Sequence, residues 1–270
     1  MLTIAPIYVI GDIHGYLGVL RTILREAHLI DAAHHWIGGS ATLWFLGDLV
    51  DRGPDSVAVL DFVMALQQEA REVGGSVDSL LGNHELLMLA AYQFGQNSIG
   101  LHPNFAVLWR HNGGVKGDLA KLREKHVSWL RERPAMALVE NALLIHADAT
   151  FYTRYGHSVA EVNETFKNLL THNNTLAWEV LIETSSMRGV FADQYGGHEF
   201  IERFTHIFGG ERIIHGHSPI SSVIGGAARK VAQPYIYAEG KCINVDGGIY
   251  LGGSGFVYRL PNSDVKQQIG

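Results

Sequence analysis

Residues 41–55, ATLWFLGDLVDRGPD, read as a buried strand that ends in a charged turn. Apolar and β-branched residues fill the first half of the stretch, which is typical of a strand. Asp48, Asp51 and Arg52 then follow within a few residues, flanked by glycines that allow the backbone to crowd around them. A core strand that stops in two carboxylates and a guanidinium indicates that chemistry is carried at the end of the strand.

The same pattern occurs on either side of this stretch. Residues 7–29 (IYVIGDIHGYLGVLRTILREAHL) and residues 76–92 (SVDSLLGNHELLMLAAY) each begin as a strand, pass through glycine and polar residues, and become helix-periodic. Alternating strands and helices predict an α/β layer arrangement, in which ligands bind outside the carboxyl ends of the strands. The polar residues expected at that edge are Asp12, His14, Asp48, Asp51, Asn83 and His84.

The remainder of the chain predicts further helices and a strand-rich end. Residues 94–116 look irregular, and AMALVE and ALLIHADA flank Asn141 as a hairpin. Helices are expected at about Asp118–Arg131, Val159–Leu170, Thr175–Glu183 and His198–His206. A strand is expected in ERIIHGHSP (residues 211–219), and alternating strands after residue 230. We therefore expect one domain over residues 1–270, with two packed mixed sheets (a β-sandwich) flanked by helices.

Composition limits the class of protein. Hydrophobic residues make up 47% of the chain and charged residues 18%, which suits a globular protein with a sizeable core. The formal charge of −6 gives no general attraction for nucleic acid or anionic membranes. The only cysteine, Cys242, excludes an intramolecular disulfide, and no apolar run approaches the roughly 20 residues that span a bilayer. The amino terminus shows no secretion signal, so a cytoplasmic location is expected.

The polar residues at the strand ends form a mixed set of oxygen and nitrogen donors. Such a set suits manganese, iron or zinc better than calcium, which prefers oxygen alone. A carboxylate can bridge two ions, so Asp48 is the expected bridge. One ion would then be completed by Asp12 and His14, and the other by Asn83, His146 and His217. Two ions in one site clamp both oxygens of an in-line displacement.

The series GDIHG, GDLVDRG, GNHE, the strand-borne His146 and HGHSP resembles the calcineurin-like metallophosphoesterases. The DRG and GNHE forms look like the phosphoprotein phosphatase branch, which includes bacterial serine/threonine phosphatases, and HNGG and INVDGG are similar to its small bacterial members. The resemblance runs from about Ile7 to Gly248 and is weakest between Phe151 and Gly210. It implies a β-sandwich between helical layers, two divalent ions with manganese favoured, and attack by metal-bound hydroxide.

The resemblance also implies roles for four further residues. His84 is the expected general acid, oriented by Asp51, and Arg52 is expected to hold phosphate oxygen. Arg188 in SSMRGVF is the expected second arginine, because phosphatases of this type carry one in the corresponding region. The alternatives are that His84 caps the helix that follows and that Arg188 is an ordinary surface residue.

Two positions near the motifs stay open. Asp148 stands where the family has a small residue, and it either supports a metal-binding imidazole or caps the following segment. The resemblance assigns the metal to His217, after Gly216, and leaves His215 as a strand-end residue. Alternation along a continued strand would put both histidines on the same side, so spacing alone does not separate them.

Three functions are compatible with this constellation. Hydrolysis of phosphoserine and phosphothreonine in proteins is favoured, and other small phosphoesters are candidate substrates of the same chemistry. A symmetrical dinucleoside tetraphosphate hydrolase is the first alternative, although spacing identifies no slot for a base. A non-catalytic phosphate-binding relative is the second, and the filled donor positions argue against it.

Overall fold

The first three predicted strands form one sheet with a late strand at its edge. In the computed structural model, which describes residues 5–95, 104–192 and 196–261, this sheet has the order β3-β2-β1-β9. Its three pairs of neighbouring strands differ in direction: β1 is parallel to β2 and β2 to β3, whereas β9 runs antiparallel to β1. The strands are β1 (Ile7–Ile10), β2 (Thr42–Phe45), β3 (Ser76–Ser79) and β9 (Tyr258–Arg259).

The second sheet comes from the later half of the chain. Its order is β4-β5-β6-β8-β7, with parallel pairing in the middle and antiparallel pairing at both edges. The strands are β4 (Met136–Val139), β5 (Ala142–Ile145), β6 (Arg212–His215), β7 (Tyr235–Tyr237) and β8 (Cys242–Asn244). The predicted hairpin around Asn141 is confirmed as β4 and β5.

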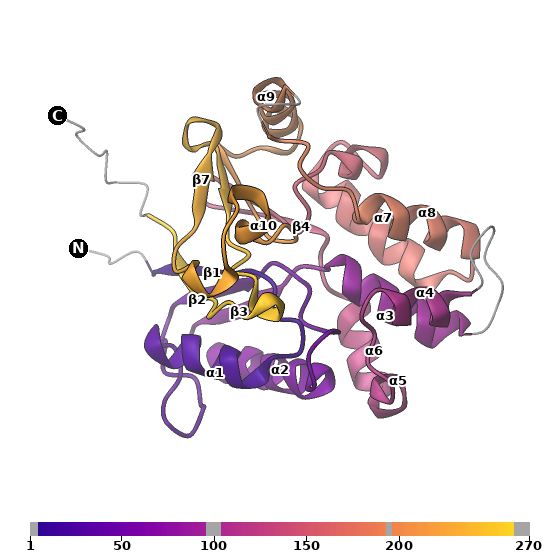
Figure 1. Cartoon of the computed structure of the whole chain (residues 1–270), viewed down its shortest axis with the longest axis horizontal. Coiled ribbons are helices and arrows are strands. Elements are labelled where there is room, and N and C mark those ends of the chain that lie inside the picture. The colour runs from indigo at the N-terminus through magenta and orange to yellow at the C-terminus, as the bar shows by residue number, and fades with distance from the viewer. Residues whose placement is uncertain (1–4, 96–103, 193–195, 262–270) are drawn as a thin grey trace.

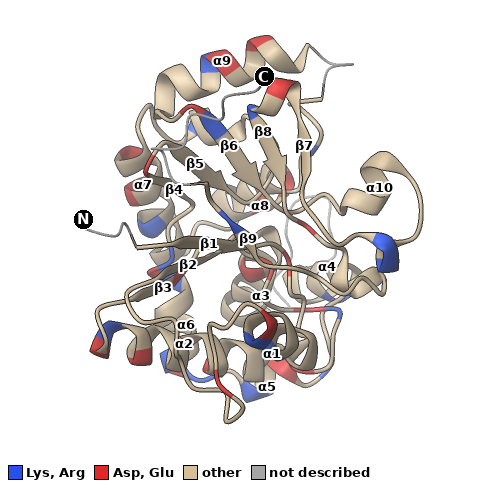
Figure 2. Cartoon of the chain, turned by 90° about the vertical axis from the view of Figure 1, so that its left-hand side faces the viewer, with Lys and Arg blue, Asp and Glu red and all other residues tan. Residues whose placement is uncertain are grey.

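The two sheets pack face to face with helices outside them. A buried cluster joins residues of both sheets, among them Val9, Leu46, Leu144, Ile214 and Ile243. Figure 2 shows β5, β6, β8 and β7 above β1, β2 and β3, with α1 and α2 below and α9 on top. The predicted class, two mixed sheets flanked by helices, is therefore confirmed.

The helices follow the expected amphipathic segments with two corrections, and the short helix α10 is an addition that the sequence did not predict. They are α1 (Leu17–Glu26), α2 (Ser56–Glu72), α3 (Asn83–Phe94), α4 (Phe105–His111), α5 (Asp118–Lys121), α6 (Glu124–Arg131), α7 (Val159–Thr171), α8 (Thr175–Ser185), α9 (Gly197–Phe208) and α10 (Ile220–Ile224). Figure 1 shows α3, α4, α7 and α8 grouped at one side of the sheets. None of the helices in the described ranges is both long and apolar enough to cross a membrane.

The first correction concerns α4, which lies inside the segment predicted as irregular. Its helix is short, but Asn104 caps it by accepting the Val107 N–H at 2.8 Å, and Phe105 and Trp109 are buried. Tertiary burial thus stabilises a helix that is too short for its apolar residues to show a helical periodicity in the sequence. Residues 96–103 of the segment predicted as irregular lie outside the described residues.

The second correction concerns the predicted polar helix, which is two short helices, α5 and α6. Leu122 and Arg123 between them have extended backbones. His126 explains the restart, since its Nδ1 accepts the Arg123 N–H at 3.0 Å and its Nε2 lies 3.0 Å from Asp61 on α2. A cap held by a residue some sixty positions away is not visible in a local pattern.

Candidate metal centre

The loops after β1 and β2 are joined through their backbones. The N–H groups of Ile13 and His14 both donate to the carbonyl oxygen of Asp48, at 3.0 and 2.8 Å. In return, the Gly53 N–H donates to the His14 carbonyl at 2.8 Å. These bonds fix the GDIHG and GDLVDRG motifs against each other, so their side chains share one edge of the sheet.

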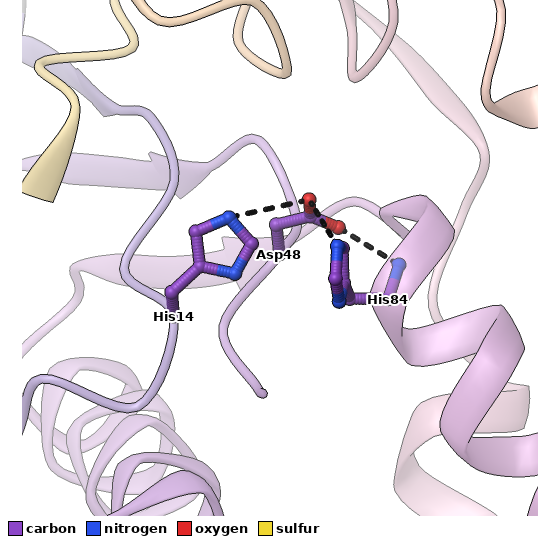
Figure 3. Close-up of side chains that lie close together, drawn as sticks. All are labelled: His14, Asp48 and His84. Carbon is purple, nitrogen blue, oxygen red and sulfur yellow. Dashed lines mark hydrogen bonds and ion pairs between the residues drawn. The ribbon is translucent and has the colours of Figure 1, made fainter. Parts of the chain in front are cut away.

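Asp48 lies at the centre of the polar cluster. Its carboxylate belongs to two buried trios of donor atoms, one with His14 and His84 and one with His146 and His217. Within each trio the donor atoms lie within 4.8 Å of one another. Figure 3 shows the His14 and His84 rings on either side of the Asp48 carboxylate. A carboxylate common to both trios is the arrangement that a bridging ligand requires.

Two features of the cluster fit the presence of cations. Within the described ranges, Oδ2 of Asp48 is buried without a hydrogen-bond partner, and burial raises the pKa of this carboxyl well above its usual range. Oδ1 of Asn83 faces Nε2 of His146 at 3.1 Å. Burial lowers the pKa of His146 to about 4, so a lone pair of a neutral ring meets an amide oxygen there. Divalent ions would satisfy both the carboxylate oxygen and this pair of acceptors.

The backbone selects the tautomer of two of these histidines. Nδ1 of His14 donates to the carbonyl oxygen of Val50 at 3.0 Å, and Nδ1 of His146 donates to that of Leu46 at 2.9 Å. Because a carbonyl oxygen only accepts, the proton of each neutral ring is on Nδ1. Nε2 of each ring therefore presents a lone pair toward Asp48, as a metal ligand must.

Asp12 connects the two sides of the cluster. Its Oδ1 accepts the His217 N–H at 2.9 Å, and its Oδ2 lies 3.6 Å from Nε2 of His14. Gly216 makes this approach feasible, since an added Cβ would stand 2.4 Å from Oδ1 of Asp12. All six residues predicted as metal ligands therefore lie in one cluster, and His84, which was predicted as the acid, belongs to the first trio.

His84 is held by a carboxylate, as the predicted acid role requires. Its Nδ1 donates to Oδ2 of Asp51 at 2.9 Å, and Nε1 of Trp109 donates to Oδ1 of Asp51 at 2.7 Å. Burial lowers the pKa of His84 well below its usual value, and the charges of His14 and Arg52 lower it further. The side chain of His84 thus faces Asp51 and the cluster, and its backbone N–H donates to Oδ1 of Asp48 at 3.0 Å.

Arg52 lies across the cluster. Its guanidinium donates to Nε2 of His14 at 2.8 Å and to Nε2 of His84 at 3.0 Å. The ring of Tyr250 supports the guanidinium at 3.8 Å from its centroid, a cation–π contact. Arg52 also donates its backbone N–H to the carbonyl oxygen of Gly113, in the HNGG segment, at 2.8 Å.

The remaining predicted positions lie to one side of the cluster. Arg188 is exposed and makes no hydrogen bond or ion pair with any residue that the structure describes. Asp148 accepts the hydroxyl of Ser218 and the N–H of Gly189, both at 2.8 Å, so its bonds within the described part of the chain reach no imidazole. Neither role expected for Asp148 is observed.

The two histidines of HGHSP point to different places because β6 ends at His215. His215 lies against Tyr237, whose hydroxyl is 2.8 Å from its Nε2. His217 has a left-handed backbone (φ 65°) and places its ring 4.9 Å from that of His146. Because the strand does not continue past His215, strand alternation does not place the two side chains on the same side.

Glu85 is a site residue that the sequence reasoning missed. It is buried in the first turn of α3, and its Oε2 accepts the N–H groups of Asp48 and Gly82, both at 2.8 Å. Its Oε1 accepts the Leu49 N–H at 2.7 Å. Burial raises the pKa of Glu85 to about 7, against the lowering effect of these donors. The available signal was its place in GNHE, where a carboxylate at the start of a helix can reach back to free N–H groups.

Five residues of the cluster adopt the left-handed backbone that favours glycine. They are His14, Asp48, Asp51, Arg52 and His217. Each such residue carries strain on the order of 1 kcal/mol, which the surrounding bonds must over-determine. This concentration at one edge of the fold is typical of a site whose side chains are directed by the backbone.

The family of the chain follows from its likeness to known proteins. The profile of the family described as calcineurin-like phosphoesterase matches residues 5–221. A Shewanella-like protein phosphatase 2 from Arabidopsis thaliana is 40% identical over 78 residues, which are 29% of this chain and 20% of that protein. A symmetrical bis(5'-nucleosyl)-tetraphosphatase from Pectobacterium atrosepticum is 34% identical over 142 residues, covering 53% of this chain and 42% of that protein. The chain thus spans less than half the length of these two relatives.

Solved structures show the same fold. A cold-active protein-tyrosine phosphatase of a psychrophilic Shewanella species superposes with a TM-score of 0.73 at 23% identity, covering 96% of this chain and 76% of that one. A protein serine/threonine phosphatase from Saccharomyces cerevisiae superposes with a TM-score of 0.58 at 16% identity, covering 94% and 72%. The branch suggested by the DRG and GNHE motifs agrees with the sequence match to a Shewanella-like protein phosphatase. The solved structures support the fold.

Proposed function

The chain belongs to the calcineurin-like phosphoesterase family, and from that premise we propose that it is a dinuclear-metal-dependent phosphatase acting on phosphomonoesters, foremost phosphoserine and phosphothreonine in proteins. The observation that carries the proposal is the carboxylate of Asp48, common to two buried trios of donor atoms. A site built to bind phosphate without metals would not need so many buried groups with lone pairs directed at one point.

Two divalent ions fit the donor set. Asp12, His14 and Asp48 would hold one of them, and Asp48, Asn83, His146 and His217 the other. The mixture of carboxylate, amide and imidazole donors suits manganese, with iron or zinc as alternatives. When bound, such ions supply Lewis-acid stabilisation of the developing charge and a water of lowered pKa.

The protein's own residues would orient and protonate the substrate. Arg52 directs two donors toward the centre of the cluster, where a phosphoryl group would displace the imidazoles as its partners. His84, in its doubly protonated form, would give the proton of Nε2 to the leaving oxygen, while Asp51 holds its Nδ1–H and keeps the ring in place. Arg188, exposed at the side of the cluster, would add charge when substrate binds.

Two observations bear on the substrate. The local match to a protein phosphatase is 40% identical, which supports a phosphorylated protein as substrate. The longer match to a symmetrical tetraphosphatase supports a dinucleoside tetraphosphate as the second candidate. A non-catalytic relative is disfavoured because every predicted donor position lies in the cluster.

A substrate panel tests the proposal directly. The purified protein, loaded with manganese, is assayed on a phosphothreonine peptide and on diadenosine tetraphosphate, with Arg52→Ala beside the wild type. We expect a higher kcat/KM on the peptide and a loss on the order of a hundredfold in Arg52→Ala. A higher kcat/KM on the dinucleotide would replace the favoured substrate, and no metal-dependent turnover on either would overturn the function.

A further inference from the structure

A cavity of about 400 Å³ lies beside the polar cluster, and Arg188 is the one residue of its wall that the proposed reaction uses. Its walls come from the edge strand β7, from α10 and from the segment after α8. Figures 1 and 2 both show α10 beside β7. A cavity of this size accommodates one ring system.

Three chain segments lead from the metal cluster into the wall of this cavity. Asp148 lies two residues after His146, and Ser218 directly follows His217. Arg188 lies two residues after Ser186, whose carbonyl oxygen is 3.4 Å from Nε2 of His217. The cavity therefore adjoins the side of the cluster that His146 and His217 form.

Aromatic rings form one wall. The rings of Tyr235 and Tyr237 are parallel within 11°, with centroids 5.2 Å apart. They are two residues apart on an edge strand, so both side chains leave the same face of β7. Val223 and Pro219 add apolar surface from the side of α10. Such a wall favours a flat apolar group over a charged one.

Five polar side chains of the wall are engaged in hydrogen bonds, those of Asp148, His215, Ser218, Tyr237 and Asn244. Asp148 accepts from Ser218 and Gly189, as described above. The hydroxyl of Tyr237 donates to His215, whose Nδ1–H donates to the Gly216 carbonyl at 3.0 Å. Asn244 donates to the Ser218 carbonyl at 2.7 Å and accepts the Asp246 N–H at 2.8 Å. Among the wall's side chains in the described part of the chain, those of Arg188, Ser222 and Tyr235 remain as partners for a ligand. A nucleobase needs partners for all its ring nitrogens and exocyclic groups, whereas a phenyl-type ring needs none, so the phenyl-type ring fits better.

We propose that the cavity is a specificity subsite for an aromatic side chain of the peptide substrate, next to the phosphorylated residue. The inference rests on the proposed phosphatase function and deepens it, because it names a sequence preference. Tyr235 and Tyr237 stack on the incoming ring, and Arg188 lines the subsite on the segment whose Ser186 reaches His217.

The test is a scan of phosphothreonine peptides in which phenylalanine replaces alanine at each position near the phosphothreonine in turn. At one position we expect phenylalanine to raise kcat/KM on the order of tenfold, mainly through KM. Tyr235→Ala should remove most of the phenylalanine-to-alanine ratio of kcat/KM, because it deletes one of the two stacking rings. Ala192→Phe should remove it by filling the cavity, so the two variants test the subsite by opposite changes in volume.

Tyr92→Ala is the matched control, since Tyr92 is an exposed tyrosine on α3 outside the cavity. The phenylalanine-to-alanine ratio of this variant should equal that of the wild type, and thermal melting checks that all three variants fold. A flat scan in an enzyme that hydrolyses the alanine peptide overturns the subsite and leaves the phosphatase function in place. A Tyr235 dependence seen only with diadenosine tetraphosphate overturns it in favour of a nucleobase. An enzyme that hydrolyses no phosphopeptide overturns the proposed function and, with it, the subsite.

Discussion

The two sheets contribute to the site in different ways. The loops of the first sheet are joined by backbone bonds and by the Glu85 carboxylate, and they carry Asp48, Asp51 and Arg52 on strained backbones. The second sheet contributes His146 and His217 to the two trios, each anchored by a hydrogen bond to a residue that follows a first-sheet strand. Other polar residues of this sheet and its loops, Asp148, His215 and Asn244 among them, line the cavity beside the cluster. The first sheet thus fixes the geometry of the chemistry, and the second has room to vary what is recognised.

The largest effect is expected at the centre of the first-sheet side. Asp48→Asn removes the charge common to both trios, so turnover should fall on the order of 10³-fold or more. Steady-state rates and metal content measured together check this. Two bound ions and near-wild-type turnover in Asp48→Asn would contradict the bridging role.

The next effect tests the acid on the same side. His84→Asn should reduce turnover of alkyl phosphates by about 10² to 10³, because the leaving oxygen needs a proton. A good leaving group such as para-nitrophenolate needs little protonation, so its rate should fall much less. Equal losses on both substrates would show that His84 acts by position and not by proton transfer.

Glu85 provides a direct comparison with the second-sheet side. In the wild type both carboxylate oxygens of Glu85 accept backbone N–H groups. Glu85→Gln replaces one of these oxygens by an NH2 group, so two donors face each other, and the free energy of unfolding should fall by about 2 kcal/mol. The matched variant is Asp148→Asn. Its remaining oxygen can accept the Gly189 N–H, and the Ser218 hydroxyl can rotate to accept from the new NH2 group, so the free energy of unfolding should fall by less. Denaturant unfolding of both variants measures the difference, and a larger loss in Asp148→Asn would reverse the contrast between the two sides.

The two arginines extend the contrast to substrate binding. Arg188→Ala should lower kcat/KM on a phosphopeptide about tenfold, less than Arg52→Ala, because Arg52 is held by two imidazoles and by the ring of Tyr250. Kinetics of both variants on one peptide give the comparison. Unchanged kinetics in Arg188→Ala would show that Arg188 is a surface residue with no role in substrate binding.

The smallest effect lies outside both sides of the site. Partial burial opposes ionisation of Asp61, but its hydrogen bonds with Lys125 and His126 lower its pKa. A carboxyl with a lowered folded-state pKa contributes stability above its unfolded pKa and loses it as pH falls through the folded value. Asp61→Asn should therefore cost about 0.5 kcal/mol at neutral pH and nothing in strong acid. Unfolding curves at both pH values check the sign, and a cost that persists in acid would exclude the ionic explanation.

The two sides of the site also differ in how much of each the sequence predicts. The first-sheet side was predictable because each motif is local: a strand, a glycine and the polar residues of one loop. Glu85 was missed because its partners are backbone N–H groups in another loop, which no residue pattern identifies. The cavity was missed because its walls, such as Asp148 and Tyr235, come from distant segments whose approach depends on sheet order. The capped restart at Arg123 was missed for a similar reason.

The left-handed backbone at His14, Asp48, Asp51, Arg52 and His217 has an evolutionary consequence. Glycine and asparagine relieve this conformation at little cost, and either replacement at an aspartate also abolishes the charge that the chemistry uses. At these positions, selection for stability and selection for activity therefore point in opposite directions. A lineage released from the need to hydrolyse phosphate should lose these residues early, and the inactive descendants should melt at higher temperature than their active ancestor.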